Sequence, residues 1–531
     1  MSIIYGFYGG GHNSSASLIV DGKIVYCVEE ERMNRIKAGH YDKDDFPILS
    51  SEEIIKRSGI NFSQAHHKMF AIPIHLNKTQ SLVGYDYETV SHHSAHNYSA
   101  YFTSGMEGKV LSVSYDGGGD SSLMKIFLCE DGKMNLVKKL DANKGGSISL
   151  VWAFMTTWMM GRFDDCWHKW RMCKDEGKLM GMAPDGMYSE NWQRIFESIL
   201  QYKNLNFYPS GSDQKTKFVM ESLYDAGYFD TPKKREIASF NLQFFTEKIM
   251  LEFFEDLHNL YPEYTKIVLS GGLFANVKLN QKINELPWVE EIYICPAMGD
   301  DGLSLGSAIM KAVEVGDITK PFKLDSAALG FEYSDDEIFE ISKSYNFDSK
   351  PYDVEEISED IHQGKIIGWF QGRMEYGPRA LGSRSILVRP TDKSTHKLLN
   401  ERLNRHDTMP FAPMVMNEHF EDIFTFSKSK YAAQFMTICY TTKEEWIPKI
   451  PAVIQKSDKT ARPQVVVKDN LPKVWELMES YRQKSGIPVL LNTSFNVHNE
   501  PIIENPAHAF DHLQNKIVDK LVIGNYVYTN K

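Results

Sequence analysis

The sequence predicts a mixed α/β protein of two domains, a duplicated N-terminal domain at 1–330 and a smaller α/β domain at 331–531. Three observations predict this class. Segments 3–28 and 110–137 repeat one order of strands and glycine turns, strands and helical segments alternate along the rest of the chain, and the periodicity weakens around Pro321 and Gly330. At about 150 residues per domain, 531 residues predict two large domains or three smaller ones.

The composition is that of an ordinary globular protein, with 42% apolar and 24% charged residues, which excludes collagen, coiled coil and general disorder. A net charge of −11 argues against a protein that mainly grips nucleic-acid phosphates. Six scattered cysteines without a CxxC pair indicate free thiols in a reducing compartment. The N-terminus does not read as a signal peptide, and the most apolar segment, 151–160, is too short for a bilayer. We therefore expect a soluble cytoplasmic protein with no membrane partner.

The two repeats share five features in one order. The first has a strand at 3–8, glycines before His12, a strand at 16–20, an Asp-Gly hairpin and a strand at 23–28. The second begins with a strand at 110–115, followed by Asp116 and three glycines, and it continues in the same order. Isolated tight hairpins would explain the glycine turns alone. The shared order favours a duplicated lobe, as in the sugar-kinase, Hsp70 and actin superfamily, where phosphates lie between two related halves.

The rest of the first domain continues as strands followed by helices. A β-branched strand at 266–269 ends in Ser-Gly-Gly, and a helix is predicted at 273–283 with Asn276 near its first turn. A glycine pair between a strand and a helix N-terminus favours anion binding. A further strand at 289–295 leads to Asp300 and to a helix of small residues.

Histidines at i and i+4 open a predicted helix in the HHSAH motif at 92–96. His92 and His96 then share one helix face and can share a metal, although a polar face explains the pattern equally well. Asp116 and Asp300 each follow a predicted strand, at the edge where open α/β sheets bind ligands. Two histidines and two carboxylates suit Fe, Mn or Zn with open positions.

Other charged residues of the first domain allow two interpretations each. His12, in the first glycine turn, is a candidate general base or a residue that caps the turn. The run at 29–37 fits a solvated edge, and the segment around Glu176 and Lys178 fits a loop with a chance ion pair.

The second domain has an arginine-rich centre at 368–385. Arg373, Arg379 and Arg384 are spaced by glycines, which suits planar recognition of phosphate or carboxylate oxygens. Downstream lie PFAP at 410–413, Arg462 in TARPQ, and NTSFN at 492–496.

On these motifs the chain resembles the ATP-dependent O-carbamoyltransferases, typified by the nodulation-factor, cephalosporin and tobramycin carbamoyltransferases. The resemblance covers essentially the whole length. It rests on HNSSASLIVDG, EEERMNRIK, HHSAH, SYDGGGD, EGKLMGMAP, SGGLFANVKLN, GDDGLSLG, WFQGRMEYGPRALGSRSIL, MPFAP and LLNTSFN.

The resemblance implies an actin-like (ASKHA) domain similar to the tRNA threonylcarbamoyl-transfer protein Kae1, followed by a YrdC-like domain. The YrdC-like domain is implied to make carbamoyl-adenylate from carbamoyl phosphate and Mg-ATP, and the Kae1-like domain to transfer the carbamoyl group to a hydroxyl. Implied site residues are a divalent metal site, Fe before Mn or Zn, at His92, His96, Asp116 and Asp300; a base, His12, with a carbamoyl-adenylate contact, Lys37; a nucleotide site at Gly117, Gly118, Glu176, Lys178, Gly271, Gly272 and Asn276; and an ATP and carbamoyl phosphate site at Arg373, Arg379, Arg384, Arg462, Asn492, Ser494 and Asn496.

Two departures from the family pattern lie in the second domain. The usual His-x-Asp-Gly-Thr-x-Arg reads KSDKTAR at 456–462, so Lys456 and Lys459 replace its histidine and glycine, and Met409 stands where relatives often carry an arginine.

The motifs address the donor and leave the acceptor open. It is a natural-product or sugar hydroxyl, or a hydroxymethyl pyrimidine of a nucleotide or DNA, although the charge does not indicate nucleic acid. A threonylcarbamoyl-type transferase acting on tRNA and a non-catalytic nucleotide and metal sensor are the alternatives. A homodimer also stays open.

Overall fold

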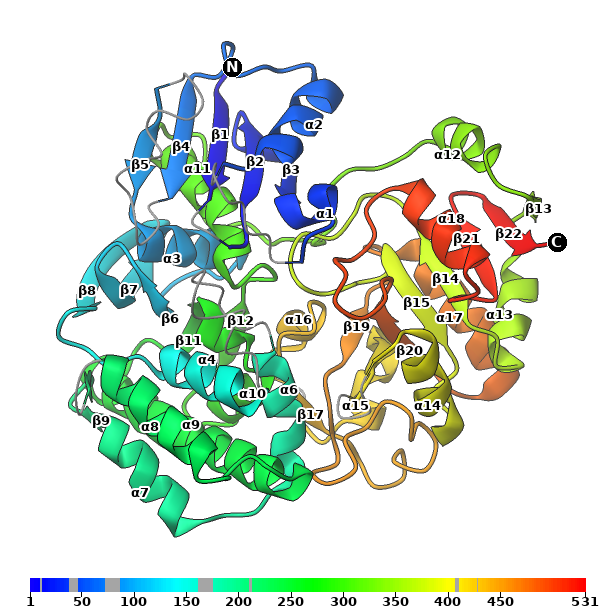
Figure 1. The fold of residues 1–531 in the computed structure, drawn as a ribbon. Helices are drawn as coiled ribbons and strands as arrows, with labels where there is room; N and C mark the ends of the chain where they lie inside the picture. Colours follow the sequence, from blue (N-terminus) through cyan, green and yellow to red (C-terminus); the bar gives the residue numbers. More distant parts are fainter. Residues whose placement is uncertain are drawn as a thin grey trace. The chain divides into compact units, whose positions relative to one another are not determined.

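The computed structural model describes residues 1–9, 12–37, 46–71, 86–160, 175–209, 213–405, 410–426 and 428–531. These residues form two compact units, the first made of 1–30 and 38–324 and the second of 31–37 and 325–531 (Figure 1). The boundary expected at 330/331 lies a few residues beyond the one observed. The sequence did not indicate that the short segment 31–37 belongs with the second unit.

The first unit contains two five-stranded sheets with one strand order (Figure 1). In each sheet the first three strands are antiparallel, and the last two run parallel to the central strand. This common order confirms the predicted duplication. The orders are β3 (Lys23–Glu29), β2 (Ser15–Val20), β1 (Ile3–Tyr8), β4 (His67–Ala71), β5 (Glu88–Val90), and β8 (Lys133–Asp141), β7 (Ser122–Glu130), β6 (Val110–Gly119), β11 (Lys266–Ser270), β12 (Glu291–Ile294).

Both Asp-Gly hairpins are confirmed, at equivalent places in the two sheets. Asp21 and Gly22 have φ of 48° and 75°, and Asp131 and Gly132 have φ of 49° and 80°. Left-handed φ at both central residues is what a type I′ turn requires, and its twist matches that of the flanking strands. Local turn chemistry therefore sets the register of β2 with β3 and of β7 with β8.

Two helices connect the sheets of the first unit to its candidate site. Helix α3 (His92–Thr103) begins at Ser91, whose side chain accepts a hydrogen bond from the Ser94 amide. Helix α11 (Leu303–Glu314) packs against α3 and β1. The backbones of α3 and α11 approach so closely that a Cβ on Gly306 would lie 2.1 Å from the Ala95 carbonyl oxygen. Glycine at 306 is therefore needed for this packing.

The remaining helices of the first unit surround these elements. The helix expected at 273–283 begins only at Val277, because 272–275 form a 3₁₀ turn and Asn276 caps α10. No helix among the described residues combines the length and apolar character needed to cross a membrane. Further elements are α1 (Glu30–Asn34), of which only Glu30 belongs to the first unit, α2 (Ile48–Ser58), α4 (Ile148–Met159), α6 (Glu176–Met182), α7 (Glu190–Ile199), β9 (Leu200–Lys203), β10 (Asn206–Pro209), α8 (Asp213–Asp225), α9 (Pro232–Leu260) and α10 (Val277–Asn284).

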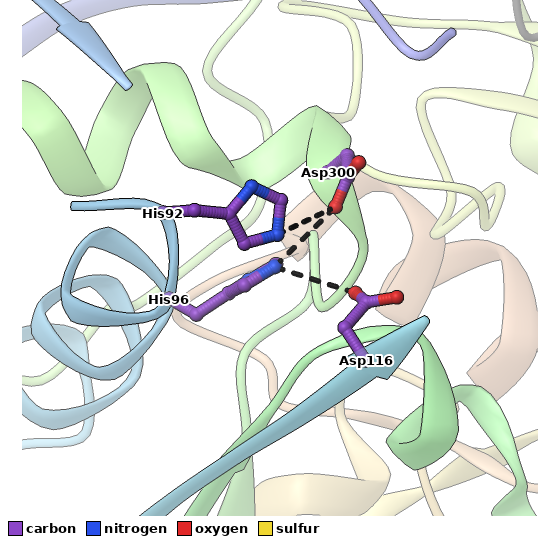
Figure 2. Close-up of side chains that lie close together, drawn as sticks. All are labelled: His92, His96, Asp116 and Asp300. Atoms are coloured by element: carbon purple, nitrogen blue, oxygen red, sulfur yellow. Dashed lines mark ion pairs between the residues drawn. The ribbon is translucent and has the colours of Figure 1, made fainter. Parts of the chain in front are cut away.

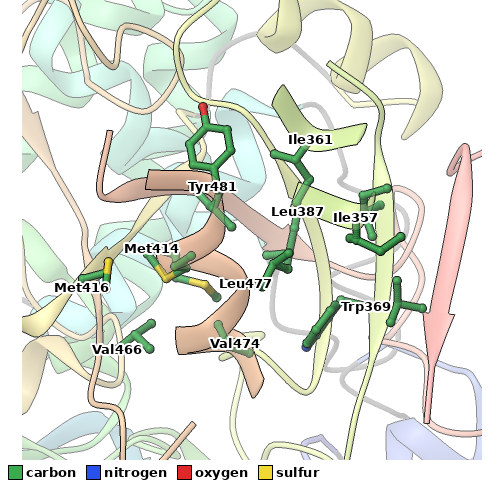
Figure 3. Close-up of a cluster of buried hydrophobic side chains, with 14 of the residues drawn as sticks. Ile357, Ile361, Trp369, Leu387, Met414, Met416, Val466, Val474, Leu477 and Tyr481 are labelled. Atoms are coloured by element: carbon green, nitrogen blue, oxygen red, sulfur yellow. The ribbon is translucent and has the colours of Figure 1, made fainter. Parts of the chain in front are cut away.

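The second unit is built on one mixed eight-stranded sheet. Helices α13 (Val354–His362) and α17 (Pro472–Ser485) pack on each other, and their buried side chains meet those of the central strands (Figure 3). Trp369 and Leu387 are fully buried there. The strand order is β13 (Phe347–Pro351), β22 (Tyr526–Asn530), β21 (Lys520–Ile523), β14 (Ile367–Phe370), β15 (Arg384–Val388), β20 (Val489–Ser494), β16 (Ala412–Met416), β19 (Gln464–Val466).

Segment 31–37 is held in the second unit by two arginines. Arg32 Nη2 donates to the Gly377 carbonyl at 2.7 Å. Arg35 donates from Nη1 and Nη2 to the carbonyls of Ile502 and Pro501, at 2.7 and 2.8 Å. Since 1–30 and 38–324 belong to the first unit, the chain enters the second unit here and leaves it again.

Candidate functional site

Four predicted side chains of the first unit come together in one cluster (Figure 2). His92 and His96 lie on successive turns of α3, Asp116 lies near the end of β6, and Asp300 begins the 3₁₀ turn after β12. Asp300 Oδ1 is 3.4 Å from Nε2 of both histidines, and His96 Nε2 is also 3.4 Å from Asp116 Oδ2. One potential ligand atom from each residue lies within 4.8 Å of all the others.

The cluster fits a metal ion because its side-chain nitrogen and oxygen atoms are buried and several of them make no hydrogen bond to the described residues. His92, His96 and Asp300 are buried. Among the described residues, neither ring nitrogen of either histidine nor Asp300 Oδ1 has a hydrogen-bond partner. A buried polar group left unsatisfied costs about 1–3 kcal/mol. A divalent cation would satisfy one nitrogen of each histidine together with Asp300 Oδ1, and imidazole nitrogen with carboxylate oxygen suits Fe, Mn or Zn.

The electrostatics of the cluster also favour a cation. Burial lowers the pKa of His92. Burial acts the same way on His96, but Asp116 and Asp300 outweigh it and raise the pKa of His96 to about 9. For Asp300 burial is outweighed by the neighbouring histidines, which hold its pKa well below the usual range. The two carboxylates therefore attract positive charge to the point where the histidine nitrogens lie.

The third histidine of the HHSAH motif has a different role. His93 Nδ1 is 3.1 Å from Ser114 Oγ, and Nε2 is 3.0 Å from the Ser122 carbonyl oxygen. Burial, together with the neighbouring histidines, holds the pKa of His93 well below its ordinary value. His93 is thus a neutral core residue that ties α3 to β6 and β7.

The glycine turns at 117–118 and 271–272, which the sequence predicted to bind an anion, donate backbone hydrogen bonds to the Asp116 carboxylate. The Gly117 amide donates to Asp116 Oδ1 at 2.5 Å, and the Gly272 amide donates to Asp116 Oδ2 at 2.8 Å. The Gly271 amide donates to the Met298 carbonyl, and Gly271 and Gly118 have φ of 95° and 147°. In this structure the two glycine turns therefore orient the Asp116 carboxylate.

Two residues of the cluster were missed by the sequence reasoning. Tyr8, at the end of β1, donates its hydroxyl hydrogen bond to Asp300 Oδ2 at 2.6 Å. Gly119 lies against His92, and a Cβ there would be 2.2 Å from His92 Cγ. Their positions beside the two glycine turns were a signal, but the partners come from distant parts of the chain.

The two predicted catalytic residues lie in different units. His12 Nε2 is 3.6 Å from Asp300 Oδ2, so His12 borders the cluster, and its side chain is one-quarter exposed. Its Nδ1 is 3.2 Å from Asn13 Oδ1. Lys37 is exposed and ends segment 31–37 of the second unit.

Two other predicted nucleotide contacts, Asn276 and Lys178, have local partners, and a third, Glu176, is affected by burial. Asn276 Oδ1 accepts from the Leu279 amide, and its Nδ2 donates to Gln243 Oε1 at 2.8 Å, so Asn276 caps α10. Lys178 pairs with Asp175 at 2.8 Å. Burial raises the pKa of Glu176 to about 7, which puts its protonation within the neutral range.

The arginine-rich loop of the second unit joins β14 to β15 and is shaped by a buried carboxylate. Glu375 Oε1 accepts from the amides of Leu381, Ser383 and Arg384, at 2.7, 2.6 and 3.0 Å. Asn492 Nδ2 donates to the Ala380 carbonyl at 3.0 Å, so this predicted site residue also holds the loop.

Two of the three loop arginines stabilise the backbone around them by donating hydrogen bonds to carbonyl groups. Arg373 donates to the carbonyls of Gly330 and Leu329, at 2.9 and 2.6 Å. Arg384 is fully buried over the Phe370 ring. It donates to five carbonyls, those of Phe331, Gln371, Gly372, Ser383 and Glu504. Arg379 is half-buried on the same loop.

A pair of arginines elsewhere in the second unit fits an anion. Arg405 and Arg462 are half-buried, and burial together with the charge of Arg462 lowers the pKa of Arg405 to about 10. Among the described residues no carboxylate forms an ion pair with either, whereas Arg405 Nη1 donates to Thr493 Oγ1 at 3.1 Å. The sequence reasoning had not assigned Arg405.

The remaining predicted contacts of the second unit follow Thr493. Ser494, the last residue of β20, is half-buried. Asn496 Nδ2 donates to the carbonyls of Val497 and Glu500, at 3.1 and 2.6 Å. Of the family departures, Lys459 has φ of 57°, a left-handed conformation that glycine adopts without cost. Met409 lies outside the described residues.

The fold and site define a mixed α/β protein with a duplicated lobe, a buried histidine–carboxylate cluster and a separate arginine-rich unit. The family pattern of the carbamoyltransferase N-terminus matches residues 50–309, and that of the carbamoyltransferase C-terminus matches 358–530. The chain belongs to the carbamoyltransferase family. It is an enzyme that transfers carbamoyl groups.

Similar curated proteins span nearly the whole chain. An uncharacterized protein of Methanocaldococcus jannaschii is 29% identical, over 97% of this chain and 98% of its own length. Nodulation protein NolNO of Sinorhizobium fredii is 28% identical, over 97% of this chain and 78% of its own length. The 3′-hydroxymethylcephem-O-carbamoyltransferase of Amycolatopsis lactamdurans is 24% identical, over 98% of both chains.

Two solved structures show a distant likeness to this chain. Full-length HypF in its phosphate- and nucleotide-bound form has a TM-score of 0.37 and 16% identity, covering 59% of this chain and 47% of HypF. Component A of (R)-2-hydroxyglutaryl-CoA dehydratase from Acidaminococcus fermentans has a TM-score of 0.38 and 14% identity, covering 58% of this chain and 97% of that one.

Proposed function

We propose that the chain is an ATP-dependent O-carbamoyltransferase with a metal centre. In the first reaction carbamoyl phosphate, ATP and water give carbamoyl-adenylate, pyrophosphate and phosphate. In the second, the hydroxyl oxygen of the acceptor forms a bond to the carbamoyl carbon, AMP leaves, and the hydroxyl proton is removed. Relatives named O-carbamoyltransferases support a hydroxyl as acceptor.

The observation that carries this proposal is the buried cluster of the first unit. His92, His96 and Asp300 present nitrogen and oxygen atoms that lack hydrogen-bond partners among the described residues. Together with Asp116 they would hold one divalent ion, for which the ligand types favour Fe, with Mn and Zn as the other candidates. When bound, this ion supplies positive charge that stabilises phosphate and oxyanion charge.

His12 is the base of the transfer reaction in this proposal. An alcohol hydroxyl is a poor nucleophile at neutral pH, so removal of its proton accelerates attack by about 10²–10⁴-fold. His12 borders Asp300 at 3.6 Å and is partly exposed, as a base that receives a substrate proton must be. The carbamoyl-adenylate contact proposed for Lys37 rests on the family resemblance.

The second unit forms the adenylate in this proposal. Arg405 and Arg462 offer positive charge without a described carboxylate partner, which suits phosphate or carbamate oxygens. Arg379 lies on a loop whose shape Glu375 and Asn492 fix, and we assign it to the same donor. Arg373 and Arg384 support that loop through carbonyl groups.

Donor dependence tests the first reaction. Purified protein is incubated with a panel of hydroxyl acceptors, and products that gain one carbamoyl group are sought by mass spectrometry, with and without ATP. We expect product, AMP and pyrophosphate only when carbamoyl phosphate and ATP are both present. Equal transfer without ATP would refute the adenylate route.

Separate assays of the two reactions test whether the second unit forms the adenylate and the first unit transfers the carbamoyl group. We expect His12→Ala to leave ATP–pyrophosphate exchange in the presence of carbamoyl phosphate near wild type and to lower transfer by about 10²–10⁴-fold. Arg379→Ala should depress both, because it removes a charge-assisted donor contact. Arg194→Ala, at an exposed surface pair with Glu190, is the control and should change neither. Equal loss of both reactions in His12→Ala would mean one composite site.

Elemental analysis tests the metal centre. We expect about one divalent ion in the wild type and its loss in His92→Ala and His96→Ala. His67→Ala, a half-buried histidine paired with Glu88, should keep the ion. Full occupancy in both site variants would refute this ligand set.

A further inference from the structure

Tyr8 links strand β1 to Asp300, which lies almost 300 residues later in the sequence of the first unit. It is the last residue of β1, and its side chain is 2% exposed. Its hydroxyl donates to Asp300 Oδ2 at 2.6 Å, across 292 positions in sequence. The motifs that carry the family resemblance do not include this tyrosine.

The two oxygens of Asp300 have different surroundings. Oδ1 is 3.4 Å from Nε2 of both His92 and His96, and it has no hydrogen bond among the described residues. Oδ2 receives the Tyr8 hydroxyl and lies 3.6 Å from His12 Nε2. Oδ2 is therefore held by a hydrogen bond, while Oδ1 faces the histidine nitrogens, as the dashed lines of Figure 2 show.

We propose that Tyr8 is a positioning residue for the metal centre. Its hydroxyl holds Oδ2, fixes the rotation of the Asp300 carboxylate, and so presents Oδ1 as a ligand through a single oxygen. The inference rests on the proposed function, because it needs an ion at the cluster. Hydrogen bonds of this kind to ligating side chains are worth about 10–100-fold in metal affinity.

A single substitution can remove the Tyr8 hydroxyl and leave the packing of the ring unchanged. The ring belongs to a buried apolar cluster with Ala71, Ala95 and Leu303. It also meets the His92 ring edge-on, with centroids 6.0 Å apart. Phenylalanine would keep all these contacts and lose only the hydrogen bond, so Tyr8→Phe removes the orienting group without opening a cavity.

The chain offers a matched control on the same strand. Tyr5 is fully buried in β1, and its hydroxyl donates to the Ile60 carbonyl at 2.6 Å. Tyr5→Phe therefore also deletes a buried hydroxyl and one hydrogen bond from β1. Because its partner is a backbone carbonyl, it should lower stability without touching the metal centre.

The test is a titration of metal-stripped full-length protein with Co²⁺, followed by calorimetry and by the visible absorption of the bound ion. We expect Tyr8→Phe to bind Co²⁺ about 10–100-fold more weakly than wild type and with an altered spectrum. Tyr5→Phe should bind as wild type does. If Tyr8→Phe fails to fold, Tyr8→Leu, which suits the same apolar cluster, takes its place with the same expectation.

The outcomes separate the two claims. Wild-type affinity and spectrum in Tyr8→Phe would overturn the role of Tyr8 and leave the metal centre standing. Equal weakening in Tyr5→Phe and Tyr8→Phe would reduce Tyr8 to a stability residue. Absence of Co²⁺ binding in the wild type would overturn the metal centre and this inference together.

Discussion

Gly119→Ala tests whether the glycine at the end of β6 is needed to make room for the His92 ring. A Cβ at this position would lie 2.2, 2.5 and 2.6 Å from His92 Cγ, Cδ2 and Nδ1. The φ of Gly119 is not left-handed, so the backbone itself accepts alanine. The whole effect of the substitution must therefore come from the contact with the imidazole ring.

The expected size follows from these distances. Ordinary Cβ contacts begin at 3.4 Å, so the ring or its backbone must move by about 1 Å. Overpacking of this kind costs about 1–3 kcal/mol of stability. Metal–ligand distances tolerate only about ±0.2 Å, so we expect metal affinity to fall by at least about 10-fold.

A double-mutant cycle isolates the contact. Stability by urea unfolding and Co²⁺ affinity are measured for the wild type, Gly119→Ala, His92→Ala and the double variant. In the His92→Ala background the clash is absent, so Gly119→Ala should then add less than about 0.5 kcal/mol. The same stability loss in both backgrounds, or wild-type affinity in Gly119→Ala, would refute the reasoning.

Three further predictions concern the second unit. The left-handed conformation of Lys459 costs a non-glycine residue about 1–2 kcal/mol, so Lys459→Gly, the family's usual residue, should raise urea stability by up to about 1 kcal/mol; a loss would contradict this. Glu375→Leu strands three buried amides and should destabilise the chain by at least about 1–3 kcal/mol, whereas Glu375→Gln, whose amide oxygen can accept the same bonds, should retain most of the melting temperature. Hydrogen bonds from Arg482 lower the pKa of Glu479 from 4.5 to about 2, so its contribution to stability is complete above pH 4.5 and is lost as pH falls toward about 2. The difference in melting temperature between wild type and Glu479→Gln should therefore shrink through that window, and a constant difference would show that the charge of Glu479 is irrelevant.

The turns, the strands beside them and the residues at strand ends could be predicted from the sequence. Asp21-Gly22 and Asp131-Gly132 dictate their turns, and the strands beside them follow from apolar patterning. The same local logic extends to the metal-site candidates, because Asp116 lies near the end of β6, which runs parallel to β11 and β12 in one sheet. Carboxyl ends of parallel strands meet at one edge, which brings Asp116 and Asp300 together.

The partners that side chains find in distant parts of the chain could not be predicted from the sequence. The i, i+4 spacing of the HHSAH motif sets His93 apart from His92 and His96, but it does not give the partners of His93. These are Ser114 and the Ser122 carbonyl, which strand pairing brings to its ring. Arg384 and Arg379 look alike in the loop sequence, yet only the fold surrounds Arg384 with carbonyls. Residue type predicts what a side chain can do, while tertiary contacts decide which of those roles it takes.

Segment 31–37 has a consequence for synthesis on the ribosome. Arg35 is translated before its partners, because the Pro501 and Ile502 carbonyls that it binds are made 466 and 467 residues later. Contacts of such sequence separation form late, because a long loop must close first. The second unit therefore completes only after residues 501 and 502 have emerged, and it depends on an arginine made more than 460 residues earlier. A fragment that begins at 325 would lack Arg32 and Arg35 and leave the carbonyls of 377, 501 and 502 without those donors.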